Sequence, residues 1–363
     1  LCLLIEGIDF LGLIIHDSVV CFLHRSVKQP VNGGLKLQDL QSVGGHFLIS
    51  EGLVLAFTGG AYVGGWLPIR LGMWLVEVDP SLADDMIWNN VIIASQVDLS
   101  LHGSPGTAMT ILLITLLAAG AAGALLGLLS GYPAVRLGGD YLAISLLAFG
   151  EVLAIIGNNY DPVVGGPLGV RIPDVWAWAG DWRFMAASLA NCALALGVWL
   201  YLDSIEKSPM GRMLRAIRDN PDAASSLGKN VARVRLNVMV TGGVICGLAG
   251  AMYTLYTTGV APSALSRFDW TFLPWVMVVF GGSGSNVGVL IGTFTFILVQ
   301  KLIISYKFAL SFLPFDPVWL QFLLMGLVLI LVLNFRPSGL VTEKASYALS
   351  RREMAKAAGK ESL

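Results

Sequence analysis

The sequence has few of the residues from which catalytic and metal centres are built. Its 363 residues include four histidines and four cysteines, and only 13% of the chain is charged. The histidines are widely spaced, without the H-E-x-x-H pattern of a zinc protease helix. Each cysteine stands alone in an apolar run and is interpreted as a core residue, so we expect no metal site. These residues are His16, His24, His46, His102, Cys2, Cys21, Cys192 and Cys246.

Nucleotide-binding and catalytic motifs are also missing. Gly228-Lys229 has no glycine five residues earlier, and Asn230 stands where a P-loop needs Ser or Thr. The glycine-rich run 281–288 does not lie between a strand and a soluble helix, so it is not a dinucleotide fingerprint. The basic segment 207–235 is too apolar on one face to indicate nucleic acid. We therefore expect a chain that is not an enzyme, holds no cofactor and does not hydrolyse ATP by itself.

Apolar residues dominate the chain instead. They make up 55% of it, and the mean hydropathy is +0.73, which fits no soluble globular class. Several apolar runs reach the length of about 20 residues that a helix needs to cross a bilayer. The predicted fold class is an all-α polytopic membrane protein with about seven to nine transmembrane helices. The expected spans are 1–23, which carries costly charges, 46–67, 108–129, 141–156, 184–202, 238–258 and 318–333.

Two long polar loops and one interrupted segment separate these runs. Residues 76–104 are acidic, and 157–183 carry tryptophans typical of a membrane interface. Residues 271–280 are apolar but too short to cross, and the run breaks at 281–288 before apolar sequence resumes. Transport proteins use such glycine-interrupted segments as discontinuous helices near a substrate path, but an ordinary tight turn explains the pattern equally well. The sequence therefore predicts either a re-entrant element or a hairpin at 271–304.

The longest strongly basic segment, 207–235, lies between two expected spans. Ser208-Pro209 predicts a helix start, with a hydroxyl N-cap and proline at the first helical position, and Asn220-Pro221 ends that helix. A second short helix, roughly 222–227, is closed by Gly228. One apolar face flanked by arginines favours a docking platform, and a solvated basic loop is the simpler alternative. The face contains Met210, Met213, Leu214 and Ile217, and the arginines are Arg212, Arg215 and Arg218.

Basic residues are sorted by loop, which predicts an orientation. The loops 24–45, 130–138, 204–236 and 336–363 hold 3, 1, 7 and 6 basic residues, together 17 of the 23 in the chain. By the positive-inside rule these loops face the cytoplasm and the N-terminus lies outside. The predicted divisions are a poorly defined N-terminal span and cytoplasmic loop at 1–45, a membrane domain at 46–341 with its cytoplasmic loop at 204–236, and a basic cytoplasmic tail at 342–363.

Ionisable residues inside apolar runs are the default functional candidates of a membrane protein. Asp140 sits at the entrance of the span 141–156, and Glu151 lies within that span. Glu151 is a candidate for a proton relay, but a carboxylate satisfied by neighbouring helices is the simpler interpretation.

The run 132–170, YPAVRLGGDYLAISLLAFGEVLAIIGNNYDPVVGGPLGV, closely resembles the M-type permease subunit of branched-chain amino acid ABC importers. The family's pattern there is R-L-x-G-D-Y-x-A-I, followed by G-E-I/V, N-N and G-G-P-x-G. The matching residues are Arg136, Leu137, Gly139, Asp140, Tyr141, Ala143, Ile144, Gly150, Glu151, Asn158, Asn159, Gly165, Gly166, Pro167 and Gly169.

The basic segment resembles the cytoplasmic loop of the same family, G-R-x-L-R-A-I-R-D/E-x…A-A-x-x-L-G. Further family segments match at 247–253, 280–288 and 335–340, so the resemblance covers roughly 107–341. The sequence differs from the family pattern near the N-terminus, where thirteen residues separate Gly45-His46 from Gly60-Ala61-Tyr62. The loop residues that match are Gly211, Arg212, Leu214, Arg215, Ala216, Ile217, Arg218, Asp219, Ala223, Ala224, Leu227 and Gly228.

The resemblance implies the ABC-importer permease fold in the plasma (inner) membrane of a prokaryote. This chain and a second homologous permease would form the path, and two cytoplasmic P-loop ATPases, which hold ATP and Mg²⁺, would dock on the loop 204–236. An extracytoplasmic binding protein would deliver leucine, isoleucine or valine. The apolar face of the first loop helix is expected to insert into an ATPase groove, with the arginines at its rim. Membrane lipid surrounds such a subunit, and no nucleic acid is implied.

The resemblance also implies roles for particular residues. The expected coupling residues are Gly211, Arg212, Leu214, Arg215, Ile217, Arg218, Ala223, Ala224 and Gly228. The candidates for the translocation path or its gating are Asp140, Tyr141, Glu151, Asn158, Gly165, Gly166, Gly281, Gly282, Gly284 and Gly288.

Other functions stay open on the sequence alone. Within the ABC class, permeases of this type also serve urea or short amides, and more distant relatives move sugars. An ion-coupled secondary transporter would use a buried charge such as Glu151 and would need no ATPase. An intramembrane enzyme would need a catalytic pair, which the sequence does not show.

Overall fold

The computed structural model describes residues 37–76, 82, 85–137, 139–282, 286–306, 319–335 and 339–341. The expected first span at 1–23, most of the loop 24–45 and the basic tail 342–363 lie outside the described residues. Gly284 lies outside them as well.

Long apolar helices build the membrane domain, because a helix satisfies its backbone polar groups internally where lipid offers no partner. Within the described residues, five segments are long and apolar enough to cross a bilayer, and they lie in α3, α6, η2 with α9, α12 and α14. Shorter apolar helices lie in α7, η4 with α13, and α15. The long helices are α3 (Leu37–Leu75), α6 (Pro105–Arg136), α7 (Gly139–Asn159), α9 (Arg183–Lys207), α12 (Val231–Thr257), α14 (Asn286–Ser305) and α15 (Trp319–Phe335).

Shorter elements connect these helices. Among the described residues the one sheet pairs β1 with β2 in antiparallel register, Val170 opposite Val260 and Arg171 opposite Gly259. The short elements are α5 (Asn90–His102), α8 (Asp161–Val164), η1 (Gly166–Leu168), β1 (Val170–Arg171), η2 (Ala177–Trp182), α10 (Pro209–Asp219), α11 (Pro221–Ser226), β2 (Gly259–Val260), η3 (Pro262–Ala264), the π-helical turn η4 (Phe268–Phe272) and α13 (Leu273–Gly281).

The expectation of a polar loop throughout 76–104 is wrong, because this region contains the helix α5. Ile93, Val97 and Leu101 are four residues apart, so they share one face, and all three are fully buried. Because polar residues lie between them, the average composition of this region does not indicate a buried apolar face.

The core forms where α3, α6 and α12 pack together. Phe57 and Ala61 of α3 are completely buried. A Cβ atom built on Gly123 of α6 would lie 2.2 Å from the carbonyl oxygen of Gly243 in α12. The two helices therefore touch backbone to backbone, as small residues allow in membrane proteins.

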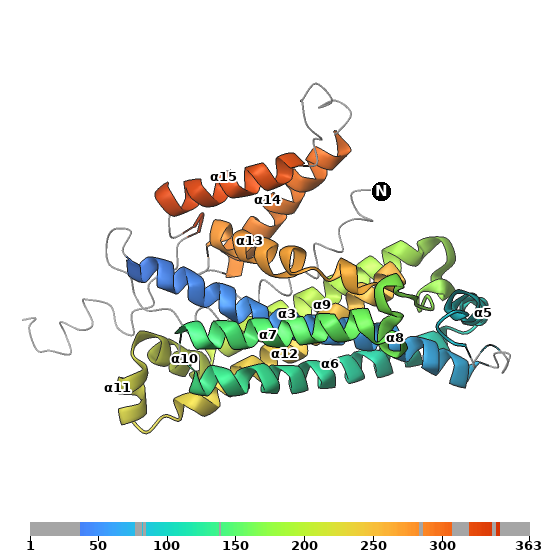
Figure 1. Cartoon of the computed structure of the whole chain (residues 1–363), viewed down its shortest axis with the longest axis horizontal. Coiled ribbons are helices and arrows are strands. Elements are labelled where there is room, and N and C mark those ends of the chain that lie inside the picture. Colours follow the sequence, from blue (N-terminus) through green and yellow to red (C-terminus); the bar gives the residue numbers. More distant parts are fainter. Residues whose placement is uncertain are drawn as a thin grey trace, which may run out of the picture.

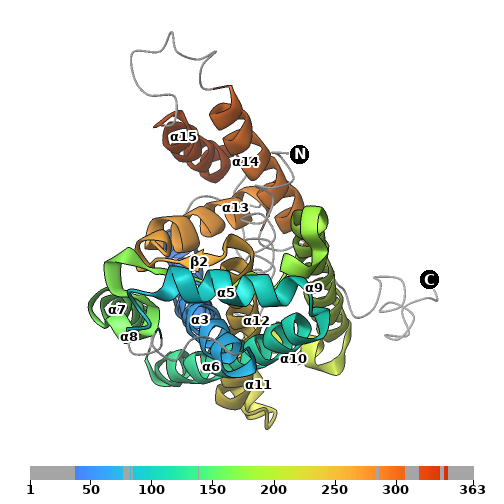
Figure 2. The ribbon, with the colours of Figure 1, turned by 90° about the vertical axis from the view of Figure 1, so that its right-hand side faces the viewer.

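The two ends of this bundle differ. The short helices α10 and α11 lie together at one end, and α5 and α8 lie at the other (Figure 1). The helices α14 and α15 stand to one side, next to α13 (Figures 1 and 2).

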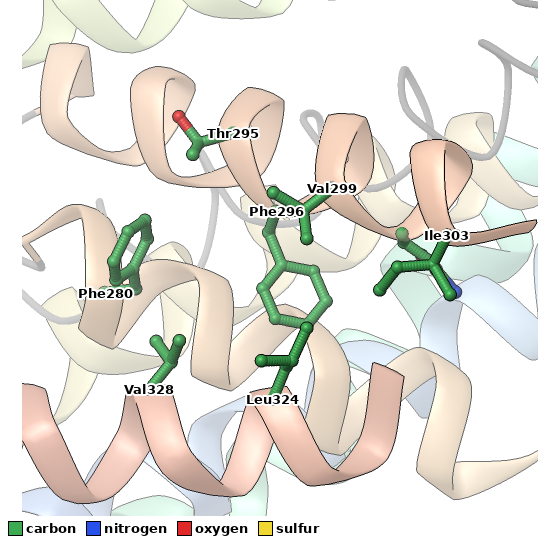
Figure 3. Close-up of a pocket in the computed structure, with 8 residues that line it drawn as sticks. Phe280, Thr295, Phe296, Val299, Ile303, Leu324 and Val328 are labelled. Carbon is green, nitrogen blue, oxygen red and sulfur yellow. The ribbon is translucent and has the colours of Figure 1, made fainter. Parts of the chain in front are cut away.

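A small cavity of about 70 Å³ lies between α13, α14 and α15. Phe296 of α14 points toward Leu324 of α15, with Val299 and Phe280 nearby (Figure 3). Among the described residues its lining is mostly apolar, with Thr295 and Gln300 as the polar members, so it carries no charged site that the structure describes.

Candidate functional site

The helices α10 and α11 form a compact unit, here called the platform, at one end of the bundle (Figure 1). The Ser208 hydroxyl accepts a hydrogen bond from the backbone N–H of Met210 at 3.1 Å. The Asn220 side-chain oxygen accepts one from the N–H of Ala223 at 2.9 Å. Pro209 and Pro221 follow these caps, at positions where the helix offers no partner for an N–H. The helix boundaries predicted from the sequence are confirmed to within one residue.

Two glycines fix the shape of the platform. Gly228 has φ +78°, the left-handed conformation expected at the residue that closes α11. A Cβ atom on Gly211 would lie 2.1 Å from the carbonyl oxygen of Glu206 and 2.7 Å from that of Ile205. No side chain fits there without moving α10 away from the end of α9. The orientation of α10 on α9 therefore depends on a direct backbone contact.

The apolar face of α10 is covered by this chain. Leu214 is 5% exposed and Ile217 is 2% exposed, while Met210 and Met213 are half-buried. The expectation that this face inserts into a partner's groove is therefore wrong. Periodicity identifies an apolar face but not what covers it, and here α10 packs against α9.

The exposed side of the platform is formed by α11 and the turn after it. Leu227 is 80% exposed there, whereas Ala224 on the same helix is buried. Arg215 is half-buried and donates to the carbonyl oxygen of Glu206 at 3.4 Å; the Arg218 side chain lies outside the described residues. The platform thus presents an apolar tip flanked by cations. The exposed residues of the platform include Arg212, Ala216, Ala223, Ser225 and Ser226, and those of the segment that follows it include Leu227, Lys229 and Arg233.

The candidates on α7 do not gather into one site. Tyr141 lies in the first turn of the helix and is largely exposed, whereas Asn158 lies near its other end. The Asn158 amide donates to the carbonyl oxygen of Ala154 in its own helix at 2.9 Å. The Asp140 side chain lies outside the described residues.

Glu151, in the middle of α7, forms an ion pair with Arg267 from the segment between η3 and η4. Arg267 also donates to the carbonyl oxygen of Leu147 at 3.1 Å, so it binds α7 twice. This pairing fits the interpretation of Glu151 as a carboxylate satisfied by a neighbouring element. Sequence reasoning missed Arg267 because the two residues lie 116 positions apart.

The interrupted segment forms where α13 meets α14, as the glycine-rich run predicts. A Cβ atom on Gly281 would lie 2.2 Å from the carbonyl oxygen of Gly288, so the two helices touch at their backbones. Leu340 and Val341 donate their N–H groups to the carbonyl oxygens of Phe280 and Gly281, at 3.0 and 3.1 Å. Irregular backbone within a membrane domain needs such partners, and the segment 339–341 supplies them.

The π-helical turn before α13 is held by an aromatic cluster. Trp270 stacks on Phe57 of α3, with ring centroids 4.0 Å apart, and meets Tyr253 of α12 edge-on at 4.9 Å. Its indole N–H donates to the carbonyl oxygen of Ala264 at 3.1 Å. Isolated π-helical turns are rare and frequently mark functional sites. Nothing in the sequence pattern signalled this one.

The opposite end of the bundle is held by a network of charged groups. Asp98 of α5 accepts a hydrogen bond from the backbone N–H of Asp174 at 2.6 Å and lies 3.4 Å from the Arg171 guanidinium. Asp174 in turn pairs with Arg183 at the start of α9. Burial raises the pKa of Asp98 above its usual range, although the hydrogen bond from Asp174 opposes this shift.

Gly165 and Gly166 lie at this same end, with φ +72° and +59°. Residues other than glycine rarely adopt two successive left-handed backbone conformations. Gly165 and Gly166 therefore shape the turn that leads through η1 into β1. Gly165, Gly166 and Asn158 are therefore far from the platform, at the other end of α7.

The two ends of the helical bundle carry different groups of charged residues. Among the residues that the structure describes, no group of three or more His, Cys, Asp or Glu side chains could hold a metal ion. Buried helices instead connect a capped, basic platform at one end to an ion-paired network at the other. These features, together with the apolar spans, define an all-α polytopic membrane protein.

The chain belongs to the family described as branched-chain amino acid transport system / permease component, whose model matches residues 43–333. The probable branched-chain amino acid transport permease protein LivM of Methanocaldococcus jannaschii is 32% identical over 290 residues, covering 79% of this chain and 83% of that protein. No solved structure shows a significant match.

More distant relatives differ in their named substrates. The high-affinity branched-chain amino acid transport system permease protein LivM of Escherichia coli is 26% identical over 248 residues, and the match covers 61% of this chain but 56% of that protein. The fructose import permease protein FrcC of Rhizobium meliloti is 26% identical over 226 residues, covering 58% of each chain. Membership of the permease family is thus established, while the named cargo varies among the relatives.

Proposed function

We propose that this chain is the membrane-spanning permease subunit of an ATP-driven ABC importer for leucine, isoleucine and valine. Support for the substrate comes from the family description and from the name of the relative that matches 79% of the chain. Urea, short amides and sugars remain the alternative cargoes, since some relatives are named for sugars.

The importer would contain this chain, a second homologous permease, two P-loop ATPases that bind ATP and Mg²⁺, and an extracytoplasmic binding protein. It would lie in the plasma (inner) membrane of a prokaryote, with the platform and the C-terminus in the cytoplasm. The positive-inside rule supports this orientation, because the loop 204–236 and the tail 336–363 hold 13 of the 23 basic residues.

The platform would couple ATP hydrolysis to the membrane helices. The exposed tip at Ala223 and Leu227 would enter a groove of the ATPase, with Arg212 at the rim. The buried Leu214 and Ile217 would instead hold α10 on its own chain. The observation that carries this proposal is the contact of Gly211 with the end of α9, because a displacement of the tip then moves a membrane-spanning helix. The other expected coupling residues are Arg215, Arg218, Ala224 and Gly228.

Transport would follow from a shift between two conformations whose contacts with the ATPases differ. The interrupted segment is the proposed gating element, because the backbone at its break takes hydrogen-bond partners from the distant segment 339–341. The proposed path and gating residues are Asp140, Tyr141, Glu151, Asn158, Gly165, Gly166, Gly281, Gly282, Gly284 and Gly288.

Reconstitution tests this function directly. The complete complex is placed in proteoliposomes, and uptake of labelled leucine is measured with loaded binding protein, with and without ATP, and with urea, acetamide or fructose as competitors. The proposal predicts ATP-dependent uptake that isoleucine and valine inhibit. Uptake that follows an ion gradient without ATP would contradict it, because Glu151 would then be a candidate for ion coupling.

A further inference from the structure

An open cleft lies at the end of the bundle opposite the platform. Its volume of about 620 Å³ falls within the range of about 300–1,000 Å³ typical of small-molecule sites. The start of α5, the segment 168–171, the end of α12 and the segment 259–264 form its walls. Figure 2 views the molecule from this end, where α5 and β2 lie.

One wall of the cleft carries Arg171, whose guanidinium can donate further hydrogen bonds. The backbone of Arg171 is fixed, because it pairs with Gly259 and its N–H donates to the Asn90 side chain at 3.1 Å. Its guanidinium is about half exposed and meets Asp98 at 3.4 Å, whereas Asp98 is held more closely, at 2.6 Å, by Asp174. A guanidinium has five N–H donors and binds a carboxylate with two of them at once. Arg171 therefore has donors left for a carboxylate from solution.

Hydroxyl groups line the same cleft at the end of α12. The Thr257 hydroxyl has one proton, and the shortest of its acceptor contacts is the carbonyl oxygen of Gly259 at 2.8 Å, so its lone pairs remain available. Thr258 has φ +51°, a left-handed conformation that is rare for a β-branched residue. Backbone outliers of this kind cluster at ligand sites. The two threonines offer acceptor oxygens suited to an ammonium group.

Apolar side chains complete the lining. Val91 is 51% exposed and Leu168 is 82% exposed, although both line the cleft. Val260, which also lines the cleft, is buried. An apolar ligand side chain would remove the surface of Val91 and Leu168 from water, which is favourable.

We propose that this cleft is a receiving site for a zwitterionic α-amino acid with a branched apolar side chain. Arg171 binds the carboxylate, the hydroxyls of Thr257 and Thr258 accept from the ammonium group, and Val91 and Leu168 contact the side chain. The proposal rests on the proposed function for its choice of substrate and deepens it, because it places the substrate on this chain after release from the binding protein.

Substrate protection of an introduced thiol tests the cleft. Leu168→Cys is introduced into the complete transporter in nanodiscs, without binding protein, and its labelling by a membrane-impermeant maleimide is timed against the parent chain. Leucine should slow labelling by the factor 1 + [leucine]/Kd, whereas leucinol, which lacks the carboxylate, should not. Protection by leucinol equal to that by leucine would overturn the assignment to Arg171.

The arginine is then varied in the labelled chain. Arg171→Gln should raise the leucine concentration that gives half-protection about tenfold or more, because a charge-assisted hydrogen bond is lost. Arg171→Lys, which keeps the charge but not the planar fork, should raise it less. The matched control is Arg70→Gln, since Arg70 is exposed on α3 but stacks on Trp66 and does not line the cleft. A labelling rate without leucine that matches the parent shows that each variant keeps the cleft intact.

ATP-driven leucine uptake by the same variants, reconstituted in proteoliposomes with loaded binding protein, separates this proposal from the proposed function. Uptake without any protection would overturn the cleft and leave the importer standing. Protection in a complex that imports no leucine would support the cleft and count against the importer for this substrate. A complex that shows neither effect would contradict both.

Discussion

The contact between α10 and α9 gives the sharpest test of how the platform works. Gly211→Ala adds one methyl group at a point where the Glu206 carbonyl oxygen lies 2.1 Å from the new Cβ position. The three heavy atoms nearest to that position all belong to the backbone, so the clash cannot be relieved by moving a side chain. The variant therefore displaces α10 as a whole or leaves a severe clash.

The size of the effect follows from the distances. Ordinary van der Waals contact begins at 3.4 Å, so the contact must open from 2.1 Å by about 1.3 Å. Overpacking of this kind costs about 1–3 kcal/mol, and the gain of alanine over glycine within a helix offsets about 0.5–1 kcal/mol. We expect a net loss of about 1 kcal/mol in the free energy of unfolding.

The functional effect should exceed the effect on stability. A displaced α10 no longer moves with α9, so ATP hydrolysis should continue while leucine uptake falls. Both rates are measured on the reconstituted complex, and stability is measured by thermal unfolding in detergent.

Gly197→Ala is the matched control. Gly197 lies within α9, and a Cβ atom there meets nothing within 4 Å, so this variant should keep full uptake and gain slightly in stability. If Gly211→Ala transported as well as Gly197→Ala, the backbone contact would not carry the coupling movement.

Three further predictions concern the rest of the molecule. Substituting Gln for Glu151 and for Arg267, singly and together, should give a coupling free energy of at most about 1 kcal/mol in a double-mutant cycle, because both side chains of the pair are partly exposed; additive effects would contradict the pairing. Asp98, whose folded-state pKa is raised, binds its proton more tightly in the folded state, so stability should fall as pH rises from the usual Asp pKa of about 4 through the raised value. Thermal unfolding measured across this pH range should show this fall in stability for the parent, and Asp98→Asn should not show it. Gly243→Val should lower the melting temperature clearly, since its Cβ would lie 2.3 Å from the Gly123 carbonyl oxygen; an unchanged melting temperature would show that α6 and α12 do not touch as described.

Local chemistry made the platform predictable. Ser208-Pro209 and Asn220-Pro221 specify helix starts through their own side chains, so they act the same way in any fold. The break at 281–288 was visible for a similar reason, because glycines permit close helix contact wherever they occur. In these regions the sequence pattern and the structure agree.

Long-range partners were not predictable from the same patterns. The apolar face of α10 could be identified, but its burial against α9 depends on tertiary packing, so Leu214 was assigned to the wrong surface. The pairing of Glu151 with Arg267 and the stacking of Trp270 on Phe57 join segments more than 100 residues apart. Periodicity within one segment contains no information about such contacts.

Co-purification tests the central claim most directly. The chain is isolated from native membranes in mild detergent, its partners are identified, and ATP hydrolysis is measured for the parent, for Leu227→Asp and for Leu196→Asn. Leu227 is exposed at the platform tip, whereas Leu196 is exposed on α9 away from it. The account predicts a P-loop ATPase with the parent and with Leu196→Asn, and its loss with Leu227→Asp. A parent chain that purifies without an ATPase, or a Leu227→Asp variant that retains one with full activity, would contradict it.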